Sequence, residues 1–426
     1  MVSVGDVRDH VINPSSRLAV MRTQHALHTL QAFPVYSLGF LKDDKLLLGG
    51  GGGATRSGIK NKLRLYDVDE TGVKFDLLTE LELEKDEDAP MSMAIDYEHN
   101  SFICGINGSM EKVEAGVNPH CRSFSIEMEE DMKPQIKFER STQLVKEKNS
   151  EAFQKVTALS KDGTLLAAGS SDGKPFNQVT LVSYPKLDLA SDPFTVPSGE
   201  LFDADFSIDG YLIVTSTTNL YVFFPSSAPS KMSPSTAHPQ LNLLNTIPVP
   251  SSHPNSSFRS TRWAPHDSKT AWSVINTTGG ASKDRRAWVV RWSIAGLGEG
   301  EKGEGRGEWK AARVAKAATR PITVFDVSQD GKLLAFGSSD LSVGILDSQK
   351  LVPLLTVLRA HEFPPTALRF NPRASLLASA SADNTLRLIA VPSNFGQSTM
   401  TTLLILFVLL AGLLAILVQR GDITWS

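Results

Sequence analysis

Cysteine is nearly absent from this 426-residue sequence, which has only two, Cys104 and Cys121. Neither belongs to a C-x-x-C pair or stands near a histidine at the spacing of metal ligands. The sequence therefore predicts neither a disulfide framework nor a zinc site. Such sparse use of cysteine is typical of proteins in a reducing compartment.

The sequence also lacks an excess of either charge. It has 43 lysines and arginines and 46 aspartates and glutamates, which gives a net charge of −3 at pH 7. Proteins that bind nucleic acids usually concentrate positive charge in order to neutralise phosphates. We therefore expect no nucleic-acid partner.

Motifs of covalent catalysis are missing as well. The sequence contains no G-x-S-x-G, no H-E-x-x-H and no P-loop lysine motif. His25 and His28 could share a helix face or a metal ion, but no third ligand stands near them. We therefore predict that the protein is not an enzyme that acts through side-chain chemistry.

Long hydrophobic runs are absent until the C-terminus. Residues 1–30 never reach the apolar run of a signal peptide, whereas residues 403–418 are sixteen consecutive apolar or glycine residues. We predict a transmembrane helix over 400–419, preceded by a polar tether over 393–399 and followed by a short lumenal tail over 420–426. The alternative, a buried globular helix, lacks a later segment to cover it. The predicted arrangement leaves the remainder of the chain in the cytosol.

A repeat is the main feature of the remaining sequence. The segments L-S-K-D-G-T-L-L-A-A-G-S-S-D around Leu159, V-S-Q-D-G-K-L-L-A-F-G-S-S-D around Val327 and F-N-P-R-A-S-L-L-A-S-A-S-A-D around Phe370 share one frame. Each segment predicts a strand, a tight turn and a second strand rich in small residues. Four weaker copies bring the number to seven, and their spacing is that of propeller blades. We predict an all-β fold, a seven-bladed WD-repeat-type propeller over residues 1–392.

Two further features refine this prediction. His361 and Asp383 occupy the positions at which WD repeats join the parts of a blade through hydrogen bonds, so we interpret them as structural. The stretches 127–150, 225–257 and 296–310 are charged or rich in Ser, Pro and Gly, and we interpret them as mobile linkers.

The segment most suggestive of function is 49–61, G-G-G-G-G-A-T-R-S-G-I-K-N. It lengthens one turn of the first blade by about seven residues relative to the last blade, so this turn should project from a face of the propeller. Glycines allow positive φ angles and can turn carbonyl groups inward, and such carbonyls together with an asparagine oxygen can bind a monovalent cation. A flexible hairpin tip remains an alternative. A phosphate site is less favoured because no helix follows.

The pattern G-G-G-G-x-x-x-x-G-I-K-N, the degenerate propeller and the hydrophobic C-terminus together resemble one known family. It is the endoplasmic-reticulum guanine-nucleotide exchange factors for the Sar-type small GTPase, the prolactin regulatory element-binding protein family. The resemblance implies a loop that binds potassium and contacts the GTPase. The loop positions it implies are Gly50, Gly51, Gly52, Gly53, Ser57, Gly58, Ile59, Lys60 and Asn61, with Gly50, Gly58 and Asn61 as the potassium ligands.

The resemblance implies a second segment and a biological role. Asp88, Ala89 and Pro90 are similar to a family segment linked to exchange, and Pro90 joins the implied GTPase contacts. The implied function is release of GDP from a Sar-type small GTPase at the endoplasmic-reticulum membrane, which starts COPII coat assembly. Two alternatives stay open: a membrane-anchored WD-repeat scaffold without exchange activity, and a nucleic-acid-binding regulator, against which the net charge argues.

Overall fold

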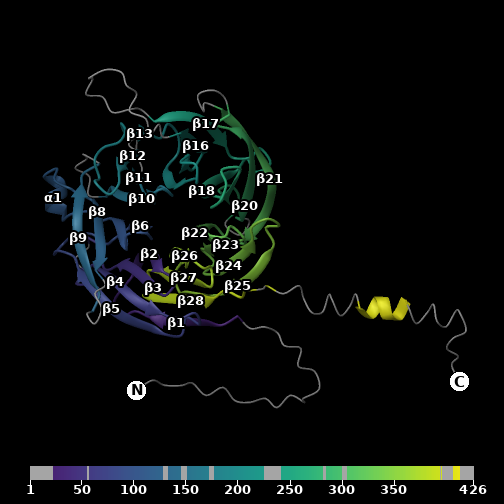
Figure 1. The fold of residues 1–426 in the computed structure, drawn as a ribbon, viewed down its shortest axis with the longest axis horizontal. Helices are drawn as coiled ribbons and strands as arrows, with labels where there is room; N and C mark the ends of the chain where they lie inside the picture. The colour runs from purple at the N-terminus through teal and green to yellow at the C-terminus, as the bar shows by residue number, and fades with distance from the viewer. Residues whose placement is uncertain are drawn as a thin grey trace, which may run out of the picture.

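A computed structural model gives the fold and describes residues 23–54, 57–127, 133–144, 151–171, 177–224, 241–281, 285–299, 305–393, 395 and 406–412. These residues form seven antiparallel sheets of four strands each, arranged as blades around a central axis (Figure 1). In each blade the first strand lies next to the axis and the fourth lies at the rim. The predicted seven-bladed propeller is confirmed.

The blades use nearly the whole described sequence. Blades 1 and 2 consist of β2 (Val35–Lys42), β3 (Lys45–Gly50), β4 (Lys62–Val68) and β5 (Phe75–Glu82), then β6 (Ser92–Asp96), β7 (Ser101–Gly105), β8 (Cys121–Glu127) and β9 (Gln135–Thr142), with helix α1 (Met110–Glu114) between β7 and β8. Blades 3 and 4 consist of β10 (Phe153–Leu159), β11 (Leu165–Ser171), β12 (Gln178–Ser183) and β13 (Phe194–Thr195), then β14 (Leu201–Phe206), β15 (Leu212–Ser216), β16 (Asn219–Phe224) and β17 (Asn242–Pro248). Blades 5 and 6 consist of β18 (Ser256–Trp263), β19 (Thr270–Thr277), β20 (Ala287–Leu297) and β21 (Arg306–Ala318), then β22 (Ile322–Val327), β23 (Leu333–Ser338), β24 (Val343–Asp347) and β25 (Pro353–Val357). Blade 7 consists of β26 (Pro365–Phe370), β27 (Leu376–Ser381), β28 (Thr385–Ala390) and, from the other end of the chain, β1 (His25–Thr29).

The repeated turn chemistry explains the hairpins between the first and second strands. In blade 6 the Ser328 hydroxyl donates to Asp330, and Gly331 takes a φ of 70° that a residue with a side chain rarely adopts. Ser160 and Asp162 repeat the same contact in blade 3. The second strands are mostly buried, and β7 and β27 fully so, because each lies between the two neighbouring blades. Their small and apolar residues therefore fit the close packing around the ring.

The ring is closed by the pairing of β1 with β28, which joins the first described strand to the last blade. The hypothesis that His25 and His28 share a helix face or a metal ion is wrong, because both belong to β1. His25 Nδ1 lies 2.9 Å from an Arg387 nitrogen, and His28 Nε2 lies 2.7 Å from the Gly72 carbonyl oxygen. Residues three apart in a strand point to opposite faces, so the two rings cannot share an ion.

The interpretation of three long stretches as linkers is wrong in part. Residues 127–150 contain β9, 225–257 contain β17, and 296–310 contain the start of β21. These are outer strands, and β9 is mostly exposed. An exposed strand needs few apolar residues, so its composition resembles that of a loop. The remaining parts of these stretches lie largely outside the described residues.

The predicted membrane segment is described only over residues 406–412, which are helical and exposed. Among the residues that the structure describes, no helix combines the length and the hydrophobicity needed to cross a bilayer. The rest of 400–419 and all of 420–426 lie outside the described residues. The transmembrane helix therefore stays a prediction.

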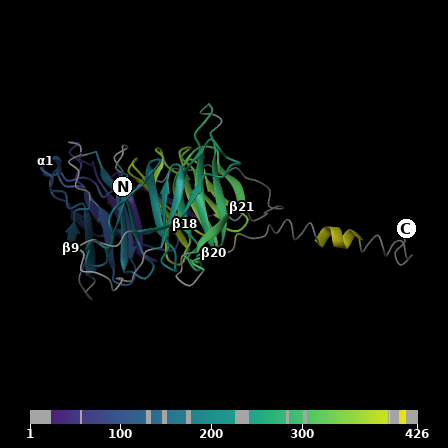
Figure 2. The same cartoon turned by 90° about the horizontal axis from the view of Figure 1, so that it is seen from above.

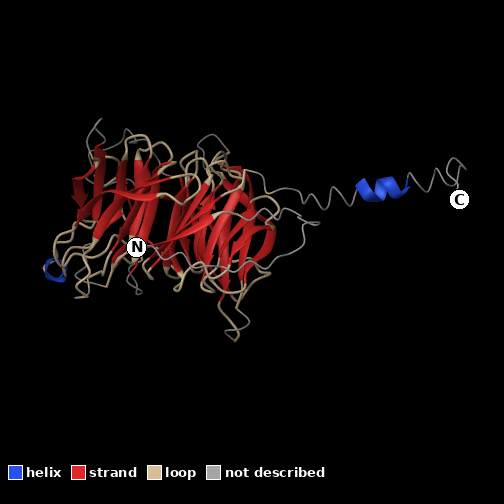
Figure 3. Ribbon diagram, turned by 90° about the horizontal axis from the view of Figure 1, so that it is seen from below, coloured by secondary structure: helices blue, strands red, loops and turns tan. Residues whose placement is uncertain are grey.

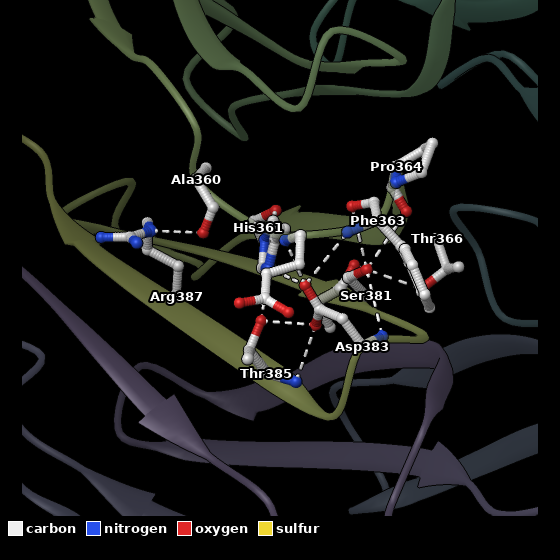
Figure 4. Close-up of polar contacts among 12 residues, drawn as sticks. Ala360, His361, Phe363, Pro364, Thr366, Ser381, Asp383, Thr385 and Arg387 are labelled. Carbon is white, nitrogen blue, oxygen red and sulfur yellow. Dashed lines mark hydrogen bonds and ion pairs between the residues drawn. The ribbon is translucent and has the colours of Figure 1, made fainter.

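His361 and Asp383 join the segment that enters blade 7 to the turn between β27 and β28, as Figure 4 shows. The His361 ring lies between two hydroxyl groups, 2.7 Å from Thr385 Oγ1 and 2.9 Å from Ser379 Oγ. The Asp383 carboxylate accepts hydrogen bonds from the backbone amides of Glu362 at 2.6 Å and Thr385 at 2.9 Å. Every heteroatom of the ring and the carboxylate is thereby used, which confirms the structural interpretation.

This network predicts that the folded state loses stability in acid. Burial lowers the pKa of His361 from 6.5 to about 4, although the Asp383 charge opposes the shift. Below about pH 6.5 the His361 ring is protonated in the unfolded chain but stays neutral in the folded chain. The free energy of unfolding therefore falls as the pH drops toward 4. We expect a slope of up to ~1.4 kcal/mol per pH unit from this residue.

Urea unfolding between pH 4 and pH 7 measures that slope. Burial raises the pKa of Asp383, but hydrogen bonds from Thr385 and Glu362 outweigh burial and lower it, so this group also favours unfolding at still lower pH. The His361→Asn variant should be less stable at pH 7 and show a shallower dependence. An unchanged slope in the variant would assign the acid sensitivity to other groups.

Candidate functional site

The connection between β3 and β4 is long for a link between the second and third strands of a blade, and only the one between β7 and β8, residues 106–120, is longer. The connection between β3 and β4 runs over residues 51–61, whereas the equivalent turn between β27 and β28 contains only residues 382–384. Since strands alternate in direction, this connection lies on the same face of the ring as the segments between blades. We call this face the loop face. Helix α1, from the corresponding connection of blade 2, lies at the rim of the same face (Figures 2 and 3).

At the start of the loop the backbone passes so close to Pro34 that no side chain would fit between them. A Cβ at Gly50 would lie 2.1 Å from the Pro34 carbonyl oxygen. The amide of Gly51 donates to that same oxygen at 2.9 Å, and Gly51 has a φ of 139°. The glycines at the start of the run are therefore required by contact and backbone conformation, not by flexibility.

Asn61 closes the loop at its other end. Its Oδ1 accepts from the Gly53 amide at 2.9 Å, while its Nδ2 donates to the Gly53 carbonyl at 3.0 Å and to the Glu87 carbonyl at 2.6 Å. Asn61 is buried. One side chain thus holds both arms of the loop together and fastens them to the segment that enters blade 2.

That segment is itself held by a buried ion pair. Arg122 on β8 donates to both carboxylate oxygens of Glu87, at 3.1 and 2.7 Å. The side chains are 12% and 4% exposed, so the pair is shielded from solvent. Bidentate pairs of this kind fix geometry as well as charge. The loop of blade 1 is therefore positioned by a strand of blade 2.

Asp88 adds a second contact between the two segments. Its Oδ1 accepts from the Ala54 amide at 3.0 Å and from the Ala89 amide at 2.8 Å. Burial raises the pKa of Asp88, although these amides oppose the shift. Burial also raises the pKa of Tyr36, and the Asp88 charge adds to that effect. The underside of the loop is thus a partly dehydrated environment.

The predicted contact positions divide into a buried base and an exposed tip. Gly50, Gly51, Asn61 and Pro90 are buried, and Gly52, Gly53 and Ile59 are half-buried. Ser57, Gly58 and Lys60 are exposed, and Lys60 forms an ion pair of 2.6 Å with Glu82. A Cβ on Gly52 would lie 2.0 Å from Ser57 Oγ, so the tip folds back over the base. The described parts of the loop, residues 51–54 and 57–61, are therefore compact, whereas residues 55 and 56 lie outside the described residues.

Pro90 lies beneath the loop and not at its surface. Its carbonyl accepts the Ser37 hydroxyl at 2.7 Å, and a Cβ on Gly49 would approach its ring within 2.7 Å. In this structure Pro90 supports the loop from below, and its predicted contact with a partner stays a prediction.

The predicted potassium ligands lie in different parts of the loop. Gly50 and Asn61 lie at the base, and Gly58 lies at the tip with a φ of 75°. Asn61 Oδ1 accepts one hydrogen bond and has a second lone pair. Among the described residues, no group of three His, Cys, Asp or Glu side chains is arranged for a metal ion. The three predicted ligands would offer neutral oxygens only.

The family model "WD domain, G-beta repeat" matches residues 352–389. "Guanine nucleotide-exchange factor SEC12" of Candida glabrata is 24% identical over 371 residues, 86% of this chain and 72% of that protein. "Putative guanine nucleotide-exchange factor SED4" of Saccharomyces cerevisiae is also 24% identical, over 84% of this chain but only 30% of its own length.

Two further similarities are shorter or structural. "SEC12-like protein 2" of Arabidopsis thaliana is 37% identical over 83 residues, 20% of this chain and 21% of that protein. The crystal structure of Chaetomium thermophilum Raptor superposes with a TM-score of 0.57 at 10% identity, over 87% of this chain and 29% of that one, and supports the fold alone. The resemblance that the sequence indicated is confirmed by the SEC12 and SED4 proteins.

Proposed function

We propose that this chain, a WD-repeat protein of the SEC12 type, is a guanine-nucleotide exchange factor for a Sar-type small GTPase. The observation that carries the proposal is the blade 1 loop, whose described residues are fastened to blade 2 by Asn61 and Asp88 on an open face of the ring. The similarity to the SEC12 protein of Candida glabrata over 86% of the chain supports it. A loop held in this way can contact a partner with little loss of conformational freedom.

Exchange of this kind needs no acid, base or covalent step. An exchange factor binds the nucleotide-free GTPase more tightly than the loaded form, so the free energy of association offsets the lost nucleotide contacts. By the same linkage, incoming GTP displaces the exchange factor. The propeller would supply a rigid surface and the exposed tip, Ser57, Gly58 and Lys60, would supply the contact near the nucleotide.

We propose that oxygen atoms of the loop hold the predicted potassium ion. Asn61 Oδ1 retains a free lone pair, and the carbonyls of Gly50 and Gly58 complete the proposed set. A weakly hydrated monovalent cation prefers such neutral oxygens. A bound ion would supply positive charge to the carbonyl oxygens that hold it. The protein residues hold the loop, and the ion would restrict its remaining motion.

We predict that exchange depends on the alkali cation. GDP release stimulated by this chain should be faster in potassium chloride than in sodium chloride at equal ionic strength, because sodium is smaller and more strongly hydrated. Release of a fluorescent GDP analogue measures the rate. Lithium chloride serves as a second control, and equal rates in all three salts would contradict a cation site in the loop.

The proposal also includes the membrane. Residues 400–419 would anchor the propeller to the endoplasmic reticulum with its ring in the cytosol, which is the arrangement their composition predicts. A Sar-type GTPase loaded beside the bilayer could insert its amphipathic helix at once, and recruitment of the COPII coat would follow.

The test is GDP release from a Sar-type GTPase with and without the full chain in a mild detergent. We expect the chain to accelerate release in proportion to its concentration. Binding of the GTPase without acceleration would favour the alternative of an anchored scaffold. Absence of both binding and acceleration would overturn the exchange function.

A further inference from the structure

A ring of residues surrounds the mouth of the central channel on the loop face. Each of these residues lies at a β-bulge near the start of the innermost strand of its blade. In six blades the pairing between the first and second strands skips one residue near the start of the first strand. The skipped residues are Tyr36, Lys155, Phe202, Arg259, Thr323 and Thr366. In β6 of blade 2 the pairing is regular. A bulge of this kind turns an extra side chain out of the sheet.

All six residues line the channel, a cavity of about 650 Å³ along the axis of the ring. Each inner strand follows a segment between blades, so it begins at the loop face and its first residues lie at that mouth. Thr323 and Thr366 have a structural role, because their hydroxyls donate to carbonyls of the next blade, Pro365 at 2.7 Å and Val35 at 2.5 Å. Arg259 likewise donates from Nε to a carbonyl of the next blade, that of Thr323, but its two terminal nitrogens take no part in this bond.

Lys155, Phe202 and Arg259 come from consecutive blades and form one cluster. The Lys155 ammonium lies 5.2 Å from the centre of the Phe202 ring, and the Arg259 guanidinium lies 4.4 Å from it. Both distances are within the range of cation–π attraction. The aromatic ring therefore holds two cations at the mouth of the channel.

Of these two cations, Arg259 has no carboxylate partner among the described residues. Its Nε donates to the Thr323 carbonyl at 3.0 Å, and its two terminal nitrogens have no hydrogen bond there. The nearby carboxylates are already used. Glu200 pairs with Lys155 at 2.5 Å, and Asp203 pairs with Arg262. Burial lowers the pKa of Arg259, although the charges of Asp203 and Glu200 oppose the shift, which marks its dehydrated position.

We propose that Arg259, held by Phe202 beside the Lys155–Glu200 ion pair, forms a binding site for a carboxylate, and that an acidic side chain of the protein docked on the loop face fills it. The two free nitrogens of a guanidinium match the two oxygens of a carboxylate. One uncommitted cation matches one negative charge, whereas a polyphosphate would need several. The mouth opens on the same face as the loop, so one partner can reach both.

The inference rests on the proposed function for the identity of that partner, the nucleotide-free Sar-type GTPase. Its affinity for the full chain is measured by fluorescence titration in 50 and 200 mM salt, with sodium citrate as a competing carboxylate probe at constant ionic strength. Arg259→Gln should weaken binding roughly 5-fold and reduce both the salt dependence and the competition by citrate. Arg259→Lys should restore part of the loss.

Lys161→Gln is the matched control. Lys161 lines the same channel from the turn between β10 and β11, at the opposite mouth, and lies 3.6 Å from Asp205. Its variant should bind as the parent does. Thermal melting accompanies every variant, and if Arg259→Gln fails to fold, Lys155→Gln and the citrate competition decide instead.

The outcomes separate the two proposals. Binding by folded Arg259→Gln at the parent affinity, with citrate acting equally on both, would overturn the carboxylate site while exchange stands. An equal loss in Lys161→Gln would also overturn it, since the effect would then be general electrostatics. A parent chain that neither binds the GTPase nor accelerates release removes the exchange function and this partner together.

Discussion

Replacement of Asn61 by alanine is expected to slow stimulated GDP release by ~10-fold or more, about 1.4 kcal/mol in transition-state stabilisation. The variant removes the three hydrogen bonds by which one side chain holds both arms of the loop and the segment entering blade 2. The loop then has to be ordered when the partner binds, and that cost is subtracted from the association free energy. Release of a fluorescent GDP analogue measures the loss.

Asn276 provides a matched control in another blade. Its Nδ2 donates to the Ile322 carbonyl and its Oδ1 accepts from the Ile322 amide, both at 2.9 Å. Asn276→Ala therefore removes comparable bonds between blades 5 and 6 but leaves the loop intact. Its exchange rate should match that of the parent. Equal slowing in both variants would attribute the effect to general loss of stability, and no slowing in Asn61→Ala would contradict the role of the loop.

The propeller could be predicted from the sequence because short local sequence patterns specify its repeat. The Ser-x-Asp-Gly turn recurs in blades 3, 4 and 6, and a second strand of small and apolar residues follows it. Both features are needed for reasons that act within a few residues. The outer strands were missed because they face solvent and pack on one side only. β9 and β17 therefore have the composition of loops, and only their pairing with the third strand makes them regular.

The position of the candidate loop in the sequence could be predicted, but the contacts that hold it in place could not. Counting residues between strands located the loop, and its glycines and Asn61 were recognised from the pattern. The supports of the loop, Glu87 and Arg122, stand 35 residues apart, and no local pattern relates them. The bulges at the channel mouth could not be predicted from the sequence either, because a bulge depends on how two strands pair with each other. Contacts that only the tertiary structure creates have no signature in one sequence.

The ion pair beneath the loop leads to the largest expected loss of stability. Arg122→Met would leave Glu87, which is 3% exposed, without a cation to balance its charge. Removing one partner of a buried pair costs about 3–5 kcal/mol, because the remaining charge keeps its full desolvation penalty. Urea unfolding should show this loss. Exchange should fall as well, because the Glu87 carbonyl accepts the hydrogen bond from Asn61 that positions the loop.

A second substitution distinguishes the charge from the geometry. In the double variant Glu87→Gln, Arg122→Met the uncompensated charge is gone, and the Gln oxygen can still accept from the Glu84 amide as Glu87 does at 3.1 Å. We expect most of the stability to return, whereas exchange should stay reduced because nothing fixes the segment against β8. Arg140→Met, on the paired strand β9, removes an exposed arginine and should change neither property. Full recovery of exchange in the double variant would mean that burial alone, without the bidentate pair, suffices to hold the loop.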